Sequence, residues 1–376
     1  MTVLVIADSP AFTSSYGGIA RHFGTSMAKR GVDVAFVSFQ HPGAKLVFES
    51  DGFRFPHYGA ASGWHRAADA VREFDPDLIL HIRDYQSIAE GTVAGAYSVR
   101  KISCGKPVWG WLPVMDETVS PAYVNAMHRE YDTILAFTPS GAELLGNAGV
   151  VRDRLEVLMP GVSAAYSDPE GPTVNLGRPG VPLVMSVGVH DQDRKTFPVL
   201  MRAYRSVVAN TDLDFYLHTA QVGTFHLLEH ISDQGVTGHW LFPMFYDKAQ
   251  GLSEETLAKY YRTARAYVAV GTGEGLDLPA MEAAALGRMV IAPDFPNHHD
   301  VLREYPDELK RLVLTHPIPR QTSWEWLMDA DSLAAALSDV TGAVPSPDAG
   351  RAYYSEHSWD VAADRFMEIA HRRGFE

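Results

Sequence analysis

The chain has 376 residues, too many for one ordinary hydrophobic core, so two or three domains are expected. Its 32 Lys and Arg against 46 Asp and Glu give a net charge of −14, which disfavours nonspecific binding to nucleic acid or to an anionic bilayer. Cys104 is the only cysteine, so a disulfide within the chain and a metal site built from cysteines are excluded.

The N-terminal run Met1–Asp8 contains a short apolar stretch without a basic flank. It is too short for a signal-peptide core or a membrane span, and no later stretch reaches the length of a span. We therefore expect a cytoplasmic protein without a membrane span and without a nucleic-acid partner. The sequence does not indicate the oligomeric state.

Short β-branched runs alternate with helical patterns over residues 1–166. A helix is predicted at Gly18–Arg30, and strands are predicted at Val3–Ala7, Val34–Ser38, Leu78–His81, Val108–Leu112 and Thr133–Phe137. Strands separated by helix-length segments favour right-handed β-α-β units and a parallel sheet that is covered on both faces.

Pro and Gly are densest in residues 167–181, which we interpret as a linker. Beyond it a helix is predicted at Phe197–Ala209, and strands are predicted at Leu183–Val187, Phe215–His218, Ala266–Val270 and Val290–Ala292. The pattern predicts an α/β protein with two domains of similar size, residues 1–166 and 182–357. Ligands of such sheets bind beyond the carboxyl ends of the strands.

Glu274 and Glu282 form the most informative pattern of the chain, with a helix start at Pro279 between them. A helix start presents free backbone N–H groups and the positive end of the helix dipole, which suit a phosphate. Carboxylates beside such an anion site are best explained as acceptors of hydrogen bonds from hydroxyl groups. The pattern therefore favours a sugar nucleotide, and the alternative is a buried helix start with two solvated glutamates.

Two further segments carry weaker signals. Gly17 and Gly18 follow the first strand and could let the backbone approach a ligand, although a tight turn explains them equally well. Arg194 and Lys195 follow Gly188 and could neutralise a diphosphate, although a solvated loop is the alternative.

These motifs occur in an order that resembles the retaining glycosyltransferase group-1 family (family 4), and the resemblance covers nearly the whole chain. It rests on Gly17-Gly18, Gly188 with Lys195, Glu274 and Glu282, Gly287 with Val290-Ile291-Ala292, Asp300, and His357-Ser358-Trp359. The resemblance implies the GT-B fold: two Rossmann-like domains whose parallel sheets face each other across a cleft, with a C-terminal helix (residues 358–376) that crosses back to the first domain.

In that family the C-terminal domain binds the nucleotide sugar and the N-terminal domain mostly binds the acceptor. The resemblance assigns Glu282 to the ribose hydroxyls, Glu274 to the hydroxyls of the donor sugar, and Lys195 to the diphosphate. It also implies phosphate or sugar contacts for a set of backbone N–H groups, those of Gly18, Leu276, Asp277 and Leu278.

The chain departs from the family pattern at several positions. Val189 replaces the usual arginine after Gly188, and Arg194 is the candidate substitute. Asp277 replaces a glycine and would bring a carboxylate near the sugar. Residues 296–300, with His298 and His299, replace the usual GG-x-x-E loop. The usual first-domain histidine is not evident, and the candidates for its role are Asp116 and His81 near Asp84, with a structural role also open for His81.

The resulting prediction is a metal-independent retaining glycosyltransferase. It would move a hexose-like unit from a nucleoside-diphosphate sugar, UDP- or GDP-linked, to an unknown hydroxyl acceptor, with no other cofactor. Aromatic residues of the first domain could stack on the acceptor or belong to the core, namely Trp64, Trp109, Trp111 and Tyr123.

Two other classes of function stay open. One is a sugar-nucleotide epimerase, with His81, Asp84 and Asp277 as candidate acid–base groups, or a noncatalytic sugar-nucleotide binder. The other is a zinc metalloprotease, because His226, Glu229 and His230 have the H-x-x-E-H spacing that places two histidines on one helix face.

Overall fold

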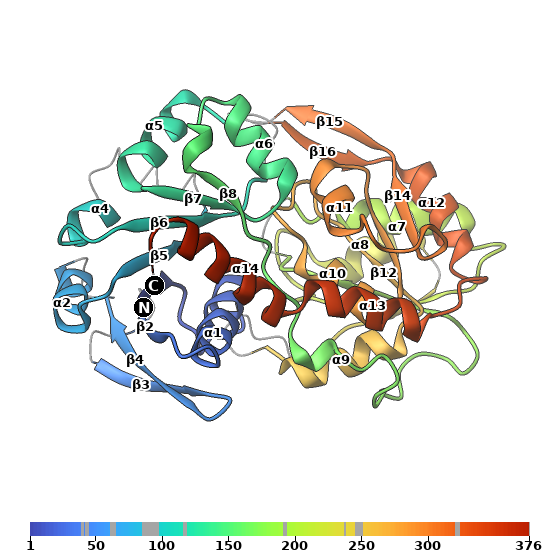
Figure 1. Cartoon of the computed structure of the whole chain (residues 1–376). Coiled ribbons are helices and arrows are strands. Elements are labelled where there is room, and N and C mark those ends of the chain that lie inside the picture. Colours follow the sequence, from blue (N-terminus) through green and yellow to red (C-terminus); the bar gives the residue numbers. More distant parts are fainter. Residues whose placement is uncertain are drawn as a thin grey trace. The chain divides into compact units, whose positions relative to one another are not determined.

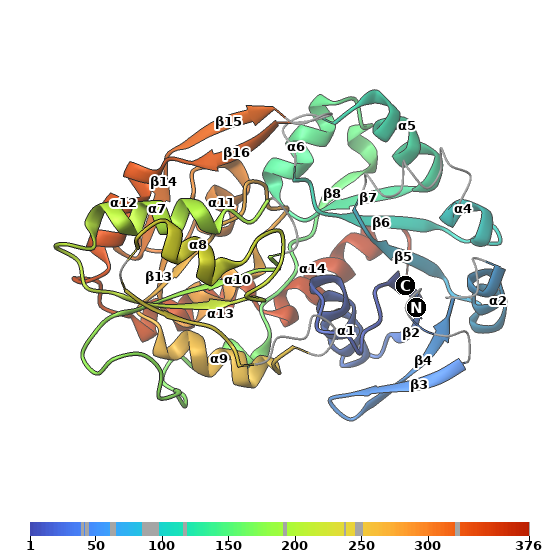
Figure 2. The ribbon, with the colours of Figure 1, turned by 180° about the vertical axis from the view of Figure 1, so that it is seen from behind.

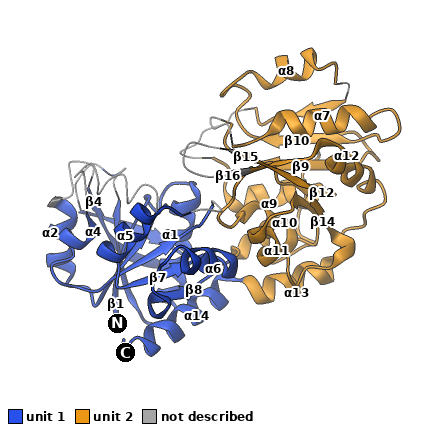
Figure 3. Ribbon diagram, turned by 90° about the horizontal axis from the view of Figure 1, so that it is seen from above, with its two compact units in different colours: residues 1–161, 358–376 blue, residues 162–357 orange. Residues whose placement is uncertain are grey.

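The computed structural model describes residues 1–38, 41, 45–60, 65–84, 98–115, 119–190, 194–236, 238–244, 251–319 and 324–375. The chain divides into two compact units, each with its own sheet (Figures 1 and 3). Unit 1 contains residues 1–161 and 358–376, and unit 2 contains residues 162–357.

Within the described residues, the sheet of unit 1 has the strand order β3-β4-β2-β1-β5-β6-β7-β8. All neighbours are parallel except the antiparallel pair β3–β4. The strands are β1 (Thr2–Ala7), β2 (Asp33–Ser38), β3 (Lys45–Ser50), β4 (Phe53–Gly59), β5 (Leu78–Ile82), β6 (Val108–Leu112), β7 (Thr133–Ala136) and β8 (Leu155–Val157). The five strands predicted from the sequence are confirmed, with ends that differ by at most one residue.

The helices of unit 1 are α1 (Ser15–Ala28), α2 (His65–Phe74), α4 (Val99–Ile102), α5 (Pro121–Glu130), α6 (Pro139–Asn147) and α14 (Trp359–Arg372). Helix α1 begins three residues before its predicted start because the Ser14 hydroxyl accepts a hydrogen bond from the Gly17 N–H at 3.2 Å and caps the helix. Helix α14, the C-terminal helix, belongs to unit 1 as predicted. Its fully buried Phe366 contacts the rings of Phe23 and Trp109, with centroids 4.9 and 5.7 Å apart.

The sheet of unit 2 is parallel and has the order β11-β10-β9-β12-β13-β14 over the described residues. Its strands are β9 (Leu183–Val187), β10 (Asp214–His218), β11 (His239–Leu241), β12 (Ala266–Val268), β13 (Met289–Pro293) and β14 (Lys310–Val313). An antiparallel hairpin, β15 (Thr315–Pro319) and β16 (Trp324–Met328), forms a separate sheet.

Helices cover both faces of this sheet. Figures 1 and 2, seen from opposite sides, show α10 and α13 on one face and α7 and α12 on the other. The helices of unit 2 are α7 (Phe197–Val207), α8 (Leu227–Asp233), α9 (Glu254–Thr263), α10 (Leu278–Ala285), α11 (Pro296–Val301), α12 (Ala330–Asp339) and α13 (Pro347–His357). In the described part of the chain no helix combines the length and the apolar character needed to cross a bilayer.

The Pro- and Gly-rich segment interpreted as a linker belongs to unit 2. The Arg262 guanidinium of α9 donates hydrogen bonds to the carbonyl oxygens of Ala165, Asp168 and Pro172, at 2.9, 2.6 and 3.5 Å. Arg288 donates to the carbonyl oxygen of Pro169 at 3.1 Å. Two arginines thus satisfy backbone groups that secondary structure would otherwise pair.

Replacing Phe366 by Ala should destabilise unit 1 alone, because the cavity would open between α14, α1 and β6. We expect a loss of about 3–5 kcal/mol in the free energy of opening of unit 1. Native-state amide hydrogen exchange of β1 and β6 measures it, with β9 and β10 of unit 2 as the internal reference. Val361, on the same helix and 42% exposed, supplies the control Val361→Ala, with a change below about 0.5 kcal/mol. Unaltered exchange in Phe366→Ala would show that α14 does not stabilise unit 1.

Candidate functional site

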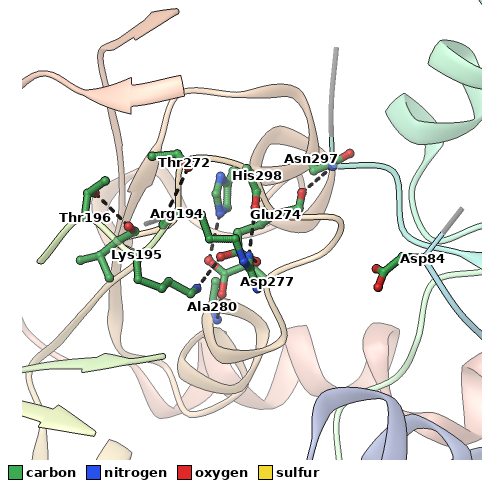
Figure 4. A network of polar contacts seen from close by, with 12 residues as sticks. Asp84, Arg194, Lys195, Thr196, Thr272, Glu274, Asp277, Ala280, Asn297 and His298 are labelled. Carbon is green, nitrogen blue, oxygen red and sulfur yellow. Dashed lines mark hydrogen bonds and ion pairs between the residues drawn. The ribbon is translucent and has the colours of Figure 1, made fainter. Parts of the chain in front are cut away.

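The loop between β12 and α10, residues 269–277, carries Glu274 and has no repeating backbone pattern of its own. Neighbouring segments hold its backbone (Figure 4). The Thr272 N–H donates to the Arg194 carbonyl (2.9 Å), and the Arg194 guanidinium donates to the Gly273 carbonyl (3.2 Å). The Asn297 side-chain amide donates to the Glu274 carbonyl (2.7 Å). The Trp326 N–H donates to the Thr272 carbonyl (2.7 Å). We call residues 269–277 the Glu274 loop.

The Glu274 side chain lies between two cations. One carboxylate oxygen pairs with the Lys195 ammonium, and the other pairs with the Arg194 guanidinium at 3.1 Å. The side chains of Lys195 and Glu274 are only 10% and 12% exposed. Burial by itself would raise the pKa of Glu274, but Lys195 and then Arg194 overcome it and lower the pKa to about 2. Glu274 is therefore a carboxylate at neutral pH and can only accept hydrogen bonds.

Gly271, in the same loop, makes room for this ion pair. A Cβ atom at this position would overlap the Glu274 carboxylate. The backbone of Gly271 also forms a bridge with Lys195. The close approach of loop and ion pair therefore requires a glycine here.

The Asp277 side chain differs from the expectation that its carboxylate lies near a sugar. It is 2% exposed and is used within unit 2. Its Oδ1 caps α10 by accepting from Ala280 N–H (3.2 Å) and also accepts from the Tyr267 hydroxyl (3.3 Å). Its Oδ2 contacts the Nε2 of His298 at 3.0 Å. The side chain therefore fixes the start of α10, with both carboxylate oxygens bonded within unit 2.

The backbone explains why a glycine would also fit at position 277. Asp277 has φ 65° and ψ 67°, the left-handed conformation that few residues besides glycine, asparagine and aspartate adopt. Its carboxylate also lies at the positive end of α10 and offsets part of the helix dipole. The N-terminus of α10 is therefore a weaker anion site than the sequence pattern predicts.

The segment at residues 296–300 is the short helix α11 and not a loop. His298 is fully buried against Asp277, whereas His299 is exposed and contacts Asp294 at 2.6 Å. Asn297 is buried and holds the Glu274 carbonyl. The two adjacent histidines thus have different environments, and the buried one faces the start of α10.

Glu282 lies on α10 and is partly buried, with Glu254 and the fully buried Tyr166 and Tyr261 around it. Burial raises the pKa of Glu282 to about 8, and Glu254 adds to the increase while the hydroxyls of Tyr261 and Tyr166 oppose it. Burial therefore favours the protonated form of this carboxyl near neutral pH. The sequence did not point to Tyr166 and Tyr261, because they lie far from Glu282 along the chain.

The glycines of unit 1 have a structural explanation. The Gly18 N–H donates to the Ser14 carbonyl at 2.8 Å, so the predicted phosphate contact of this N–H would require breaking a helix hydrogen bond. A Cβ at Gly17 would lie 2.6 and 2.7 Å from the carbonyl oxygens of Ser9 and Phe12. Gly17 is therefore needed to pack α1 against the loop after β1.

His81 is buried in the core of unit 1, with its Nδ1 2.8 Å from the Tyr131 hydroxyl. Burial, with Arg83, lowers the pKa of His81 to about 3, so it stays neutral. This environment fits a structural histidine and not a substrate contact. Asp84 is partly buried and accepts a hydrogen bond from the Tyr16 hydroxyl, whereas the alternative candidate Asp116 lies outside the described residues.

The aromatic candidates divide in a similar way. Trp109 and Trp111 are core residues, and the Trp111 indole donates to the Leu158 carbonyl at 2.7 Å. Tyr123 lies on α5 and is partly buried, and Trp64 lies outside the described residues. Stacking of Trp109 or Trp111 on an acceptor is therefore excluded by their burial.

The zinc alternative required His226 and His230 on one helix face. His226 has an extended backbone and precedes α8, so only His230 and Glu229 lie within the helix. Over the ranges that the structure describes, no group of three or more His, Cys, Asp and Glu residues is arranged to hold a metal ion.

Replacing Glu282 by Gln should stabilise unit 2 at high pH. The pKa of this carboxyl is about 8 in the folded state, against an ordinary value of 4.5, so stability is lost as the pH rises from about 4.5 to about 8. The side chain is partly exposed, so we expect Glu282→Gln to gain about 1–3 kcal/mol at pH 9 relative to pH 4. Thermal unfolding at several pH values measures this gain. Glu255→Gln, an exposed change on α9, is the control, and parallel curves for wild type and Glu282→Gln would contradict the assignment.

Known proteins give a consistent classification. Residues 181–339 match the family model of glycosyl transferases group 1. No curated protein matches the chain significantly in sequence. Among solved structures, sucrose-phosphate synthase from Thermosynechococcus elongatus has 17% identity and a TM-score of 0.72, over 99% of both chains. Anabaena HepE in complex with UDP-glucose has 12% identity and a TM-score of 0.65, over 99% of this chain and 100% of that one.

A weaker likeness connects the chain with the epimerase alternative. A putative UDP-N-acetylglucosamine 2-epimerase from Listeria monocytogenes has 11% identity and a TM-score of 0.55, over 100% of this chain and 97% of that one. At such identities these likenesses show the fold, and the family match adds the class of enzyme. The chain therefore has the GT-B fold, and its residues 181–339 match the pattern of group 1 glycosyl transferases.

Proposed function

We propose that the chain moves a hexose-like unit from a nucleoside-diphosphate sugar to a hydroxyl acceptor, with retention at the anomeric carbon and without a metal ion. The observation that supports it best is the grouping of Glu274, Arg194 and Lys195 (Figure 4). The two cations follow β9 and the carboxylate follows β12, which are neighbouring parallel strands. Ligands of parallel sheets bind at this edge.

Arg194 and Lys195 are the groups that we assign to the diphosphate. Both pair with the Glu274 carboxylate, so an incoming diphosphate would meet two positive side chains at this edge of the sheet. Charge-assisted hydrogen bonds to the leaving group stabilise the negative charge that develops on it during transfer, which is the usual source of the largest catalytic effect. Positive side chains can supply this stabilisation where other transferases use a metal ion.

Glu274 and Glu282 are assigned to the two polyol ends of the donor. Glu274 is ionised and faces the cations, so it suits the hydroxyls of the transferred sugar near the phosphates. Glu282 lies one to two turns into α10 and suits the ribose hydroxyls. Backbone N–H groups of Leu276, Asp277 and Leu278 are assigned to the sugar and the phosphate, as the family resemblance implies.

The proposed reaction balances without a protein base. The bond between the anomeric carbon and the phosphate oxygen breaks, and its electron pair leaves with the nucleoside diphosphate. The acceptor oxygen bonds to the same face of that carbon, and its hydroxyl proton passes to the leaving phosphate. The protein contributes orientation of the donor and stabilisation of the departing charge.

The epimerase alternative has less support. It needs an acid–base pair over the sugar, but Asp277 is fully engaged at the start of α10 and His81 is buried in the core of unit 1. Incubation with a nucleotide sugar and no acceptor separates the possibilities. Slow hydrolysis supports the transferase, conversion to an epimer supports the epimerase, and inertness with binding supports a noncatalytic binder.

A thermal-shift screen tests the donor class first. UDP, GDP and ADP and their sugars are added singly, because a ligand that binds the folded state raises its melting temperature. HepE, whose fold is similar, was solved with UDP-glucose, so UDP-linked sugars come first in the order of testing. No shift with any of these compounds would refute the proposed function.

Replacing Lys195 by Met should reduce turnover by about 10²–10³, because the leaving diphosphate loses a positive partner in a poorly solvated site. Lys259→Met, on α9 of the same unit, is the matched control and should keep wild-type turnover. Steady-state release of the nucleoside diphosphate measures both variants. Equal turnover in the two variants would contradict the proposed role of Lys195 in stabilising the leaving diphosphate.

Replacing Glu282 by Ala should raise the donor Michaelis constant by about tenfold or more, since a ribose hydroxyl would lose its acceptor. The effect should appear with the free nucleoside diphosphate as well, because the ribose is common to both ligands. Competition binding with each ligand measures the loss of affinity. An unchanged affinity for both would count against a ribose contact of Glu282.

A further inference from the structure

The start of α10 is joined to α11 by a buried polar pair. Asp277 Oδ2 and His298 Nε2 are 3.0 Å apart, and the two side chains are 2% and 0% exposed. A buried carboxylate without partners is costly, so this contact strongly constrains both helices. The other oxygen of Asp277 is satisfied by Ala280 N–H and the Tyr267 hydroxyl, which leaves the carboxylate little freedom to move.

The same short helix also holds the Glu274 loop at a second point. Asn297, the residue before His298, donates its side-chain amide to the Glu274 carbonyl at 2.7 Å. Helix α11 is therefore connected to the loop at position 274 through Asn297 and at position 277 through His298. These two contacts fix both ends of the segment from Glu274 to Asp277. This segment connects the residue that carries the proposed sugar-binding carboxylate to the start of α10.

We propose that the Asp277–His298 pair positions Glu274 for the donor sugar and thereby makes the site select a sugar nucleotide over the free nucleoside diphosphate. The proposal rests on the proposed function, since it needs Glu274 to bind the transferred sugar. The side chains of Asp277 and His298 are positioning groups, because both are buried and act through the loop. The diphosphate and the nucleoside are assigned mainly to the side chains of Arg194, Lys195 and Glu282, which are not part of the Asp277–His298 pair.

The test compares two affinities in each full-length variant. His298→Leu removes the imidazole partner of Asp277 at similar size, and Asp277→Gly keeps the left-handed backbone while it removes the carboxylate. We expect each variant to lose about tenfold in the ratio of its affinity for the sugar nucleotide to its affinity for the matching nucleoside diphosphate, because removal of the Asp277 charge acts on the phosphates of both ligands alike. Isothermal titration with UDP-glucose and UDP, or with the pair that the thermal-shift screen selects, gives both values.

Two controls separate positioning from general destabilisation. His298→Gln retains a side-chain amide that can donate to Asp277 and should restore much of the lost preference. His299→Gln changes the exposed neighbour on α11 and should leave both affinities at wild type. If His298→Leu does not fold, Asp277→Gly and His298→Gln still give the comparison.

The outcomes distinguish the two proposals. If the wild-type protein binds neither the nucleoside diphosphates nor their sugars, the proposed function fails. If the wild type binds both but Asp277→Gly and His298→Leu keep the wild-type ratio of affinities, the positioning role is overturned. Equal losses for both ligands would also overturn it, because they would show a general effect on the fold of the site.

Discussion

The site depends on the immobilisation of a loop that has no secondary structure of its own. The Glu274 loop exchanges backbone hydrogen bonds with the segment around Arg194, with Asn297 of α11 and with Trp326 of the β15–β16 hairpin. The ion pair of Glu274 with Lys195 then fixes the side chain. Both charges are largely removed from water, so loss of either partner would leave a costly unpaired charge. The Glu274 loop, the two cations and α11 are therefore held rigidly relative to one another. Such rigidity suits the proposed binding of a sugar in one orientation.

The two glutamates of the motif have opposite acid–base behaviour. Cations lower the pKa of Glu274 to about 2, whereas burial and Glu254 raise the pKa of Glu282 to about 8. The sequence presents two equivalent carboxylates eight positions apart, and only their surroundings distinguish them. Glu274 is a permanent acceptor. An ionised carboxylate accepts hydrogen bonds from two hydroxyls better than a protonated carboxyl does, so the proposed ribose contact would favour ionisation of Glu282.

The sequence predicted the inner strands of both sheets because β-branched runs bounded by turn residues are strong local signals, and it did not single out the outer strands β3, β4, β8, β11 and β14. It missed elements whose patterns are interrupted. Strands β4 and β15 contain Pro56 and Pro317, which argue against a strand, and α11 is too short for a helical period. Burial of His81 and the surroundings of Glu282 depend on residues far apart in the chain. Local patterns could not reveal them.

Asp277 shows why a family pattern transfers the backbone more reliably than the electrostatics. The left-handed conformation at this position is the feature that a glycine or an aspartate can both satisfy. An aspartate, however, brings a negative charge to the positive end of α10, and its carboxylate caps the helix by accepting a hydrogen bond from the Ala280 N–H. An anion at this end then competes with the protein's own carboxylate. The positive charge for the proposed diphosphate would then come mainly from side chains, and Arg194 and Lys195, placed at the neighbouring strand end, are the residues that we propose for this role.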